Sequence, residues 1–279
     1  MIVEFYGYGF GIAGPDTSTE SGPETIKNSS IMQELSFQHK WNEILKPRHE
    51  LDKISALEDY NRRFMAQFAN CHNKFCVFGG DHTSAISTVQ ATQLKHENIK
   101  LIWVDAHMDL HNLASSHSKN MHGMSLAVLL GESDAGLKKL EHIQNIKAHD
   151  ICLFGSRSFE SEEQARLNKL GVNVIYMNEI TANGLEQSWL KAIEKVNLKQ
   201  SDKLVLSIDL DAFDPMFAPA VTVPENNGIN AENFIQTLKL SKNKWNKQFI
   251  GSEIVEFSPK NDISKTTEHL IRDLLNALY

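Results

Sequence analysis

At residues 100–109 the chain reads Lys100-Leu101-Ile102-Trp103-Val104-Asp105-Ala106-His107-Met108-Asp109. The first half is almost continuously apolar, which is typical of a strand buried on both faces, as in a parallel sheet. The second half is polar, and ligands of parallel α/β proteins bind beyond the carboxyl ends of the strands. The stretch therefore predicts a parallel sheet and marks the edge of that sheet at which a site is expected.

The same apolar pattern recurs along the whole chain. Further runs occur at Ile2–Tyr8, Phe75–Phe78, Ile151–Phe154, Val172–Met177, Lys203–Asp209 and Phe249–Glu256. Between them, apolar residues recur at helical spacing in three stripes, namely Ile54, Leu57, Tyr60, Phe64, Phe68; Leu185, Trp189, Leu190, Ile193, Val196; and Leu270, Leu274, Leu278. Because strand and helix alternate throughout, the sequence predicts an α/β fold. We find no linker, internal repeat or low-complexity stretch, so the interpretation is one domain.

The composition is that of an ordinary globular protein, with 41% hydrophobic and 23% charged residues. A formal net charge of −7 argues against binding to nucleic acid or an anionic membrane, since both need clustered Lys and Arg. No apolar stretch approaches the roughly 20 residues that span a bilayer. The cysteines Cys71, Cys76 and Cys152 lack the spacing of a disulfide framework, and Met1–Phe5 has no basic leader. Reduced, buried thiols in a cytoplasmic protein are therefore expected.

Four of the predicted strands end in acids or histidines, at Gly80–His82, Asp105–Asp109, Asp209–Asp211 and Glu253–Glu256. Alternate side chains of an extended segment point the same way. The two acids and the histidine of D-x-H-x-D are therefore expected to converge, and so are the two acids of D-x-D. A single D-x-D at a strand end is usually a solvated loop or a helix cap. Three such motifs in one chain instead indicate a built site.

The residues of these motifs point to divalent metals. Four carboxylates packed together would raise one another's pKa and resist burial, and bound cations remove that cost. Carboxylates mixed with imidazoles suit manganese, iron or zinc better than calcium or magnesium, and bridging aspartates favour two ions roughly 3.5–4 Å apart. The predicted ligands are His82, Asp105, His107, Asp109, Asp209 and Asp211.

Two glycine-containing segments have competing interpretations. Gly9–Gly14 matches the dinucleotide-binding pattern G-x-G-x-x-G, but the polar loop Pro15–Thr19 follows it where a phosphate-binding helix is required, so we reject a nucleotide site. Gly79–Gly80 allows a sharp exit from the preceding strand. Asp81 is then expected to cap the next helix, with His82 at the start of that helix.

The chain resembles the ureohydrolase family, whose members include arginase, agmatinase, guanidinobutyrase, proclavaminate amidinohydrolase and formimidoylglutamase. Three motifs carry the resemblance, Gly79–His82, Asp105–Asp109 and Ser207–Pro215, and similarity extends from Glu20–Pro23 to Glu253–Pro259. The resemblance implies an α/β, three-layer α/β/α fold with a central, mainly parallel eight-stranded sheet. It also implies an arginase-like catalytic domain over residues 1–279 that holds two Mn2+ per chain, other divalent metals being alternatives.

The same resemblance implies how the metal ligands divide, with His82 and Asp109 on one ion, His107 and Asp211 on the other, and Asp105 and Asp209 as bridges. Asp109 would also hold a metal-bridging hydroxide, the nucleophile that attacks the guanidinium carbon. A metal ion lowers the pKa of its bound water, so this nucleophile forms at neutral pH.

Two further residues narrow the reaction by resemblance. Met121–Met124 contains the His-Gly pair of guanidino-cleaving ureohydrolases, where formimidoylglutamases typically have Ser-Gly. His122 would then act as a proton shuttle to the leaving amine, work that suits an imidazole near its free pKa. Glu256 resembles the carboxylate that pairs with the planar substrate guanidinium. A surface histidine and a buried structural acid are the alternatives.

The loop after the D-x-H-x-D motif favours L-arginine as substrate, with urea and L-ornithine as products. The distance between Asp105 and His122 in the sequence is similar to that in arginases, and Ser118 falls where arginases contact the α-carboxylate. Glu160 lies in the segment that contacts the α-amino group, where the arginase pattern has Asp. His111 replaces an Asn that normally helps to bind the carboxylate, and we expect it still to contact substrate.

Other functions remain as alternatives. Besides L-arginine, the substrate of an agmatinase, guanidinobutyrase or formimidoylglutamase would suit the same metal site, and Val223 in place of a Thr leaves that choice open. A deacylase of related fold would hold a single zinc, and a non-catalytic metal-binding protein would release no urea. The expected partners are a small guanidino substrate and further copies of the chain, in a homo-oligomer that the resemblance makes a trimer or hexamer.

Overall fold

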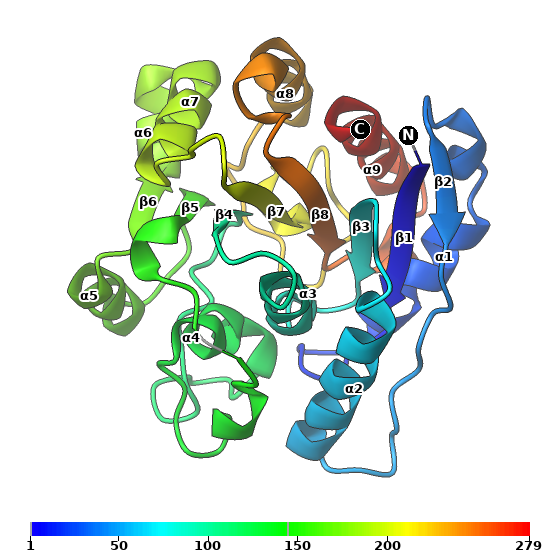
Figure 1. Ribbon diagram of the computed structural model, residues 1–279, viewed down its shortest axis with the longest axis vertical. Helices are drawn as coiled ribbons and strands as arrows, with labels where there is room; N and C mark the ends of the chain where they lie inside the picture. The colour runs from blue at the N-terminus through cyan, green and yellow to red at the C-terminus, as the bar shows by residue number, and fades with distance from the viewer. Residues whose placement is uncertain (1, 144) are drawn as a thin grey trace.

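The computed structural model describes residues 2–143 and 145–279 and arranges their strands in one eight-stranded sheet (Figure 1). The strands are β1 Ile2–Tyr8, β2 Gln38–Trp41, β3 Lys74–Gly79, β4 Ile99–Val104, β5 Ile151–Ser156, β6 Asn173–Tyr176, β7 Lys203–Asp209 and β8 Phe249–Val255. Their order across the sheet is β2-β1-β3-β8-β7-β4-β5-β6, and every neighbouring pair is parallel. The predicted parallel sheet is confirmed.

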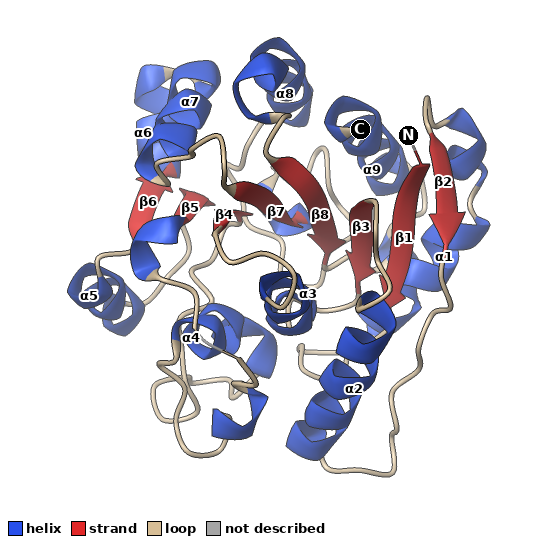
Figure 2. Ribbon diagram, in the orientation of Figure 1, coloured by secondary structure: helices blue, strands red, loops and turns tan. Residues whose placement is uncertain are grey.

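Helices cover both faces of the sheet (Figure 2). One face packs against α1 Gly22–Asn28, α6 Met177–Asn183, α7 Leu185–Lys195, α8 Ala231–Trp245 and α9 Thr266–Leu278. The other packs against α2 Lys53–Phe68, α3 Ser84–Gln93, α4 Ser125–Leu130 and α5 Ser161–Leu170. Alternate residues of each strand enter the two cores: Phe5 belongs to the first, and Tyr6 to the second. The expected three-layer α/β/α architecture is therefore confirmed.

The predicted helical stripes coincide with α2, α7 and α9. In α2, Asp52 is the N-cap and its side chain accepts a hydrogen bond from the Ser55 amide at 3.1 Å. Such a cap satisfies an amide that has no partner inside the helix. Leu57, Tyr60 and Phe64 are fully buried on the inner face of this helix. Both the start and the orientation of α2 thus follow from its sequence.

The edge strand β2 is an element that the apolar runs did not predict. Its sequence, Gln38-His39-Lys40-Trp41, alternates exposed and partly buried residues and pairs only with β1 among the described strands. Edge strands are commonly short and charged because such residues discourage pairing with another chain. A strand with this alternation contains no continuous apolar run, so such runs do not predict it.

Four central strands, in the order β3-β8-β7-β4, bring the polar motifs to one edge of the sheet.

Among the described residues, no helix is long and apolar enough to cross a membrane. Cys71, Cys76 and Cys152 are buried and form no disulfide in this part of the chain, as expected for free thiols.

Candidate metal centre

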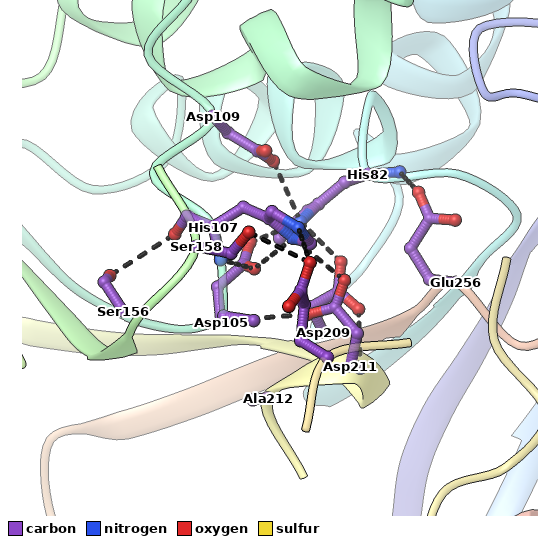
Figure 3. A network of polar contacts seen from close by, with 12 residues as sticks. His82, Asp105, His107, Asp109, Ser156, Ser158, Asp209, Asp211, Ala212 and Glu256 are labelled. Carbon is purple, nitrogen blue, oxygen red and sulfur yellow. Dashed lines mark hydrogen bonds and ion pairs between the residues drawn. The ribbon is translucent and has the colours of Figure 1, made fainter. Parts of the chain in front are cut away.

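Histidine and aspartate side chains from the ends of β3, β4 and β7 meet at one point (Figure 3). His82 Nδ1 lies 3.1 Å from Asp105 Oδ2, 3.1 Å from Asp109 Oδ2 and 3.1 Å from Asp209 Oδ2. The imidazole is completely buried. One ring nitrogen therefore faces three carboxylates from two different strand ends.

A second cluster adjoins the first. His107 Nδ1 lies 3.0 Å from Asp211 Oδ2 and 3.6 Å from Asp105 Oδ1. Asp105 belongs to both clusters: its ligand atom lies within 4.8 Å of those of His82 and Asp109, and likewise of those of His107 and Asp211. All six predicted ligands thus come together, and Asp105 stands between two potential ion positions.

The cluster fits metal ions because its own polar atoms do not satisfy one another. His82 Nδ1 and Asp109 Oδ2 are buried, and neither has a hydrogen-bond partner among the described residues. Burial lowers the pKa of His82, but the adjacent carboxylates of Asp105, Asp109 and Asp209 outweigh this and raise it well above its usual value. Burial together with the charges of Asp211 and Asp105 raises the pKa of Asp209 well above its usual range. Divalent cations would relieve this crowding of like charges, and the oxygen and imidazole donors suit manganese, iron or zinc.

The backbone after β4 differs from the expected geometry. β4 ends at Val104, Ala106 and His107 form a bend rather than an extended strand, and Asp109 has φ +50°. The period-two argument for their convergence was therefore wrong, although the side chains do converge. Backbone amides hold the aspartates instead: the His107 amide donates to Asp105 Oδ1 at 2.7 Å, and the Asp211 amide donates to Asp209 Oδ1 at 2.9 Å.

Trp103 is a site residue that the sequence analysis missed. Its ring stacks on His82, with centroids 4.1 Å apart and planes 13° apart. Its Nε1–H donates to Asp105 Oδ2 at 2.8 Å. A buried tryptophan usually needs a hydrogen-bond acceptor, so a Trp two residues before the first aspartate was the available signal. This one side chain restrains two of the predicted ligands.

His122 and Glu256 form a pair beside the cluster. His122 Nδ1 lies 3.0 Å from Glu256 Oε1, which also accepts from the His82 amide at 2.9 Å. Thr222 Oγ1 donates to the other carboxylate oxygen at 3.1 Å. Burial lowers the pKa of His122, but Glu256 and Asp109 outweigh burial and raise it to about 9. A protonated imidazole and a fixed carboxylate are thus available next to the potential ions.

The predicted recognition residues are only partly brought together. His111 Nε2 lies 2.8 Å from Glu160 Oε2 and 3.3 Å from Glu163 Oε2. Hydrogen bonding to Glu163 and Glu160 outweighs burial and raises the pKa of His111 to about 9. Ser118 instead bonds within its own loop, accepting from the Asn120 amide at 3.2 Å.

The turn between β3 and α3 differs in detail from its prediction. α3 starts at Ser84, so His82 lies before the helix rather than at its start. Asp81 does not cap α3: it accepts from the Thr83 amide at 3.1 Å and from the Ala13 amide at 3.0 Å. These bonds join the turn to the Gly9–Gly14 loop. A dinucleotide site at that loop is not favoured, since a 3-10 turn, Ser18–Ser21, follows it.

Comparison with known proteins assigns the family. The model of the arginase family matches residues 3–279. The arginase of Bacillus subtilis (strain 168) is 32% identical, covering 92% of this chain and 91% of its own length, and the arginase of Staphylococcus aureus (strain MRSA252) is 30% identical, covering 91% and 82%. The solved arginase structure from Bacillus subtilis superposes with a TM-score of 0.89 at 25% identity, over 100% of this chain and 98% of that one. By sequence and by fold, this chain belongs to the arginase family.

Proposed function

We propose that this chain hydrolyses the guanidino group of L-arginine to urea and L-ornithine, using two Mn2+ ions. Membership of the arginase family makes it a hydrolase of guanidino carbon–nitrogen bonds. The observation that carries the proposal is the meeting of the two His–Asp clusters with the His122–Glu256 pair. Neither part alone would specify this reaction.

The six ligands give the proposal its metal chemistry. His82 with Asp109 would hold one ion, His107 with Asp211 the other, and Asp105 with Asp209 would lie between them. Two divalent ions at such a site supply a nucleophile at neutral pH by lowering the pKa of a shared water. Asp109 Oδ2 has no hydrogen-bond partner among the described residues, so it can bind a metal ion or accept a proton from that water.

His122 and Glu256 would act on the substrate. Glu256 offers a planar carboxylate of the kind that pairs with a guanidinium cation. The His82 amide and the Thr222 hydroxyl fix its orientation. His122, next to it, holds a proton that it would deliver to the leaving amine, the role of a general acid.

The choice of L-arginine rests on the loop that carries His111 and on the relatives named arginase. His111 and Glu160 form a pair of an imidazole and a carboxylate, and the His111 amide donates to the carbonyl of Gly123, the residue after His122. Ser118 completes the proposed contacts to the carboxylate and ammonium groups of an amino acid. Agmatine lacks the carboxylate, and 4-guanidinobutyrate lacks the ammonium group, so both should bind less well.

Steady-state kinetics tests the proposal. The manganese-loaded chain is assayed for urea release from L-arginine, agmatine and 4-guanidinobutyrate, and kcat/KM should be highest for L-arginine. A higher value for one of the other two would reassign the substrate within the family. Release of no urea from any of the three would contradict the proposed reaction.

A metal titration separates the proposal from a deacylase with one zinc. Activity should need two tight equivalents per chain, whereas full activity with one equivalent would contradict the two-metal site.

We further propose a single catalytic domain in a cytoplasmic homo-oligomer, a trimer or hexamer by resemblance. The free buried thiols accord with a reducing compartment. Light scattering at several protein concentrations tests the assembly.

A further inference from the structure

A hydrogen-bonded chain runs from the candidate metal centre into the middle of the sheet. His82 Nε2, on the side of the ring away from the aspartates, lies 2.8 Å from Ser207 Oγ on β7. Ser207 Oγ in turn donates to Glu253 Oε1 on β8 at 2.6 Å. All three side chains are completely buried. Among the described residues, Glu253 is therefore linked by hydrogen bonds to His82 through Ser207.

The donors and acceptors in this series of hydrogen bonds determine which ring nitrogen of His82 carries a hydrogen. Both oxygens of Glu253 accept hydroxyl hydrogens, one from Ser207 and the other from Ser84 Oγ at 3.1 Å. A serine hydroxyl has one proton, so Ser207 can only accept from His82. His82 Nε2 must then carry a hydrogen, and the lone pair of a neutral ring lies on Nδ1, the nitrogen that faces three carboxylates.

We propose that Glu253, acting through Ser207, is a positioning residue that holds the His82 imidazole with its Nδ1 lone pair directed at a metal ion. The inference rests on the metal-binding part of the proposed function and does not depend on the substrate. Partners of this kind around a metal-bound histidine fix its tautomer and orientation and make it a better ligand.

The location of Glu253 also argues for this role. A buried carboxylate is costly unless several hydrogen bonds satisfy it, and an apolar residue of similar size would suit the centre of a sheet better. The second histidine provides a contrast. Its Nε2 lies 3.6 Å from Glu225 Oε1, a side chain that is 32% exposed. The restraint on His107 is therefore longer and more solvated than that on His82.

The test measures binding of Mn2+ to the metal-free full chain by calorimetry. Glu253→Gln keeps the size of the side chain and an acceptor oxygen but removes the charge that draws the Ser207 proton away from His82. Ser207→Ala breaks the chain of hydrogen bonds with a small change in volume. Each variant should weaken one of the two Mn2+ equivalents by about 10–100-fold and leave the other equivalent nearly unchanged.

The double variant decides whether Glu253 acts through Ser207. If it does, Ser207→Ala with Glu253→Gln should bind Mn2+ no more weakly than Ser207→Ala alone, since coupled residues give non-additive effects. Additive losses would overturn the proposed route. Unchanged affinity in Ser207→Ala, a variant expected to fold even where Glu253→Gln does not, would overturn the positioning role itself.

Glu4→Gln is the matched control. Glu4 on β1 is also a buried glutamate, and it accepts hydrogen bonds from Tyr6 Oη, the His72 amide and the Asn73 amide. Its loss should lower the thermal midpoint without changing Mn2+ affinity. An equal loss of affinity in this control would mean that the effect of Glu253 is only structural. Because no substrate is used, failure of the proposed reaction leaves this test intact.

Discussion

At the scale of single residues, the candidate centre works by giving each side chain several constraints. Asp105 shows this most clearly: Oδ2 accepts from Trp103, Oδ1 accepts from the His107 amide, and the same carboxylate adjoins both histidines. Burial alone would raise the pKa of Asp105, but the neighbouring His107 and His82 imidazoles lower it overall. A carboxylate held in this way is fixed in position, as the proposed bridging role requires.

Asp209 gives the first residue-scale prediction. Asp209→Ala should lose at least one Mn2+ equivalent and nearly all urea release, because Asp209 Oδ2 lies 3.1 Å from His82 Nδ1, beside the proposed position of the first ion. Metal content and kcat are measured on the same preparation. Asp150→Ala, which removes a carboxylate paired with Lys100 away from the site, should leave both unchanged. A fully active, metal-replete Asp209→Ala variant would rule out the bridging assignment.

His122 gives a second prediction, in which turnover is lost but metal binding is kept. His122→Ala removes the proposed proton donor but none of the six metal ligands, so both metal equivalents should bind while kcat falls by about 10²–10⁴-fold. The rate of urea release at saturating arginine and the metal stoichiometry are the two measurements. An unchanged kcat would exclude the shuttle role, and loss of metal would place His122 among the residues that organise the centre.

The proposed ligands and the residues that contact them differ in how far the sequence reveals them. The convergence of the six proposed ligands was predictable because they lie at the ends of apolar runs, in motifs whose residue types suit metals. Ser207 and Glu253 were not assigned a role, because their link to His82 depends on β8 lying between β3 and β7 in the sheet. The order of strands cannot be obtained from hydrophobic periodicity. Ser118 and His111 face the same difficulty, since loop conformation decides their contacts.

At the scale of elements, backbone hydrogen bonds fix the turn from β3 to α3. The Gly80 amide donates to the Tyr8 carbonyl at 2.7 Å, and the Asp81 amide donates to the Phe10 carbonyl at 2.8 Å. The turn is thereby fixed to the loop after β1, directly before His82. The apolar run of β3 and its glycines predicted a sharp exit, but the partner loop came from a segment about 70 residues earlier.

Gly80→Ala is the element-scale prediction. A Cβ at this position would lie 2.0 Å from the Phe10 carbonyl oxygen, a contact that forces the two backbones apart. The variant should be less stable, by about 1–3 kcal/mol as for other overpacked sites, and should bind metal more weakly because His82 moves. Thermal unfolding and Mn2+ affinity measure these effects.

Gly14→Ala is the control for this prediction. A Cβ at Gly14 would have its nearest neighbour at 3.6 Å, an ordinary van der Waals contact, although Gly14 belongs to the same loop region. Stability and metal affinity should therefore stay close to those of the unchanged chain. Equal behaviour of the two variants would show that the close approach of Gly80 to Phe10 has no bearing on His82.

At the scale of the whole molecule, the order β3-β8-β7-β4 is what makes a single site from distant segments. The parallel sheet and its three layers were predictable because buried strands have nearly continuous apolar sequences, and the intervening stripes have helical spacing. The exposed edge strand β2 lacks that signal. Because the proposed ligands come from three strand ends, ion binding would depend on most of the sheet being folded.

The last prediction concerns metal and global stability. Each ion that binds only the folded chain should stabilise it by about 2.7 kcal/mol at a metal concentration 100 times its Kd, and a chelator should abolish this gain. For a chain of this size the thermal midpoint should therefore rise by several degrees. Scanning calorimetry with Mn2+ and with a chelator measures the difference. The Asp209→Ala variant should show a much smaller shift, and an equal shift would indicate metal binding elsewhere.

The rise in thermal midpoint caused by Mn2+ should increase with pH. Burial and the charge of Asp105 raise the pKa of Asp109 to about 6, above its ordinary value of 3.8. The metal-free folded chain thus binds a proton more tightly than the unfolded chain does, and it loses this advantage as pH rises from about 4 through 6. Metal binding has the opposite trend, because ions compete with protons for the same carboxylates and imidazoles. The difference in midpoint between metal-loaded and metal-free protein should therefore be small at pH 5 and larger at pH 8. A difference that does not change with pH would contradict ligation by these titratable groups.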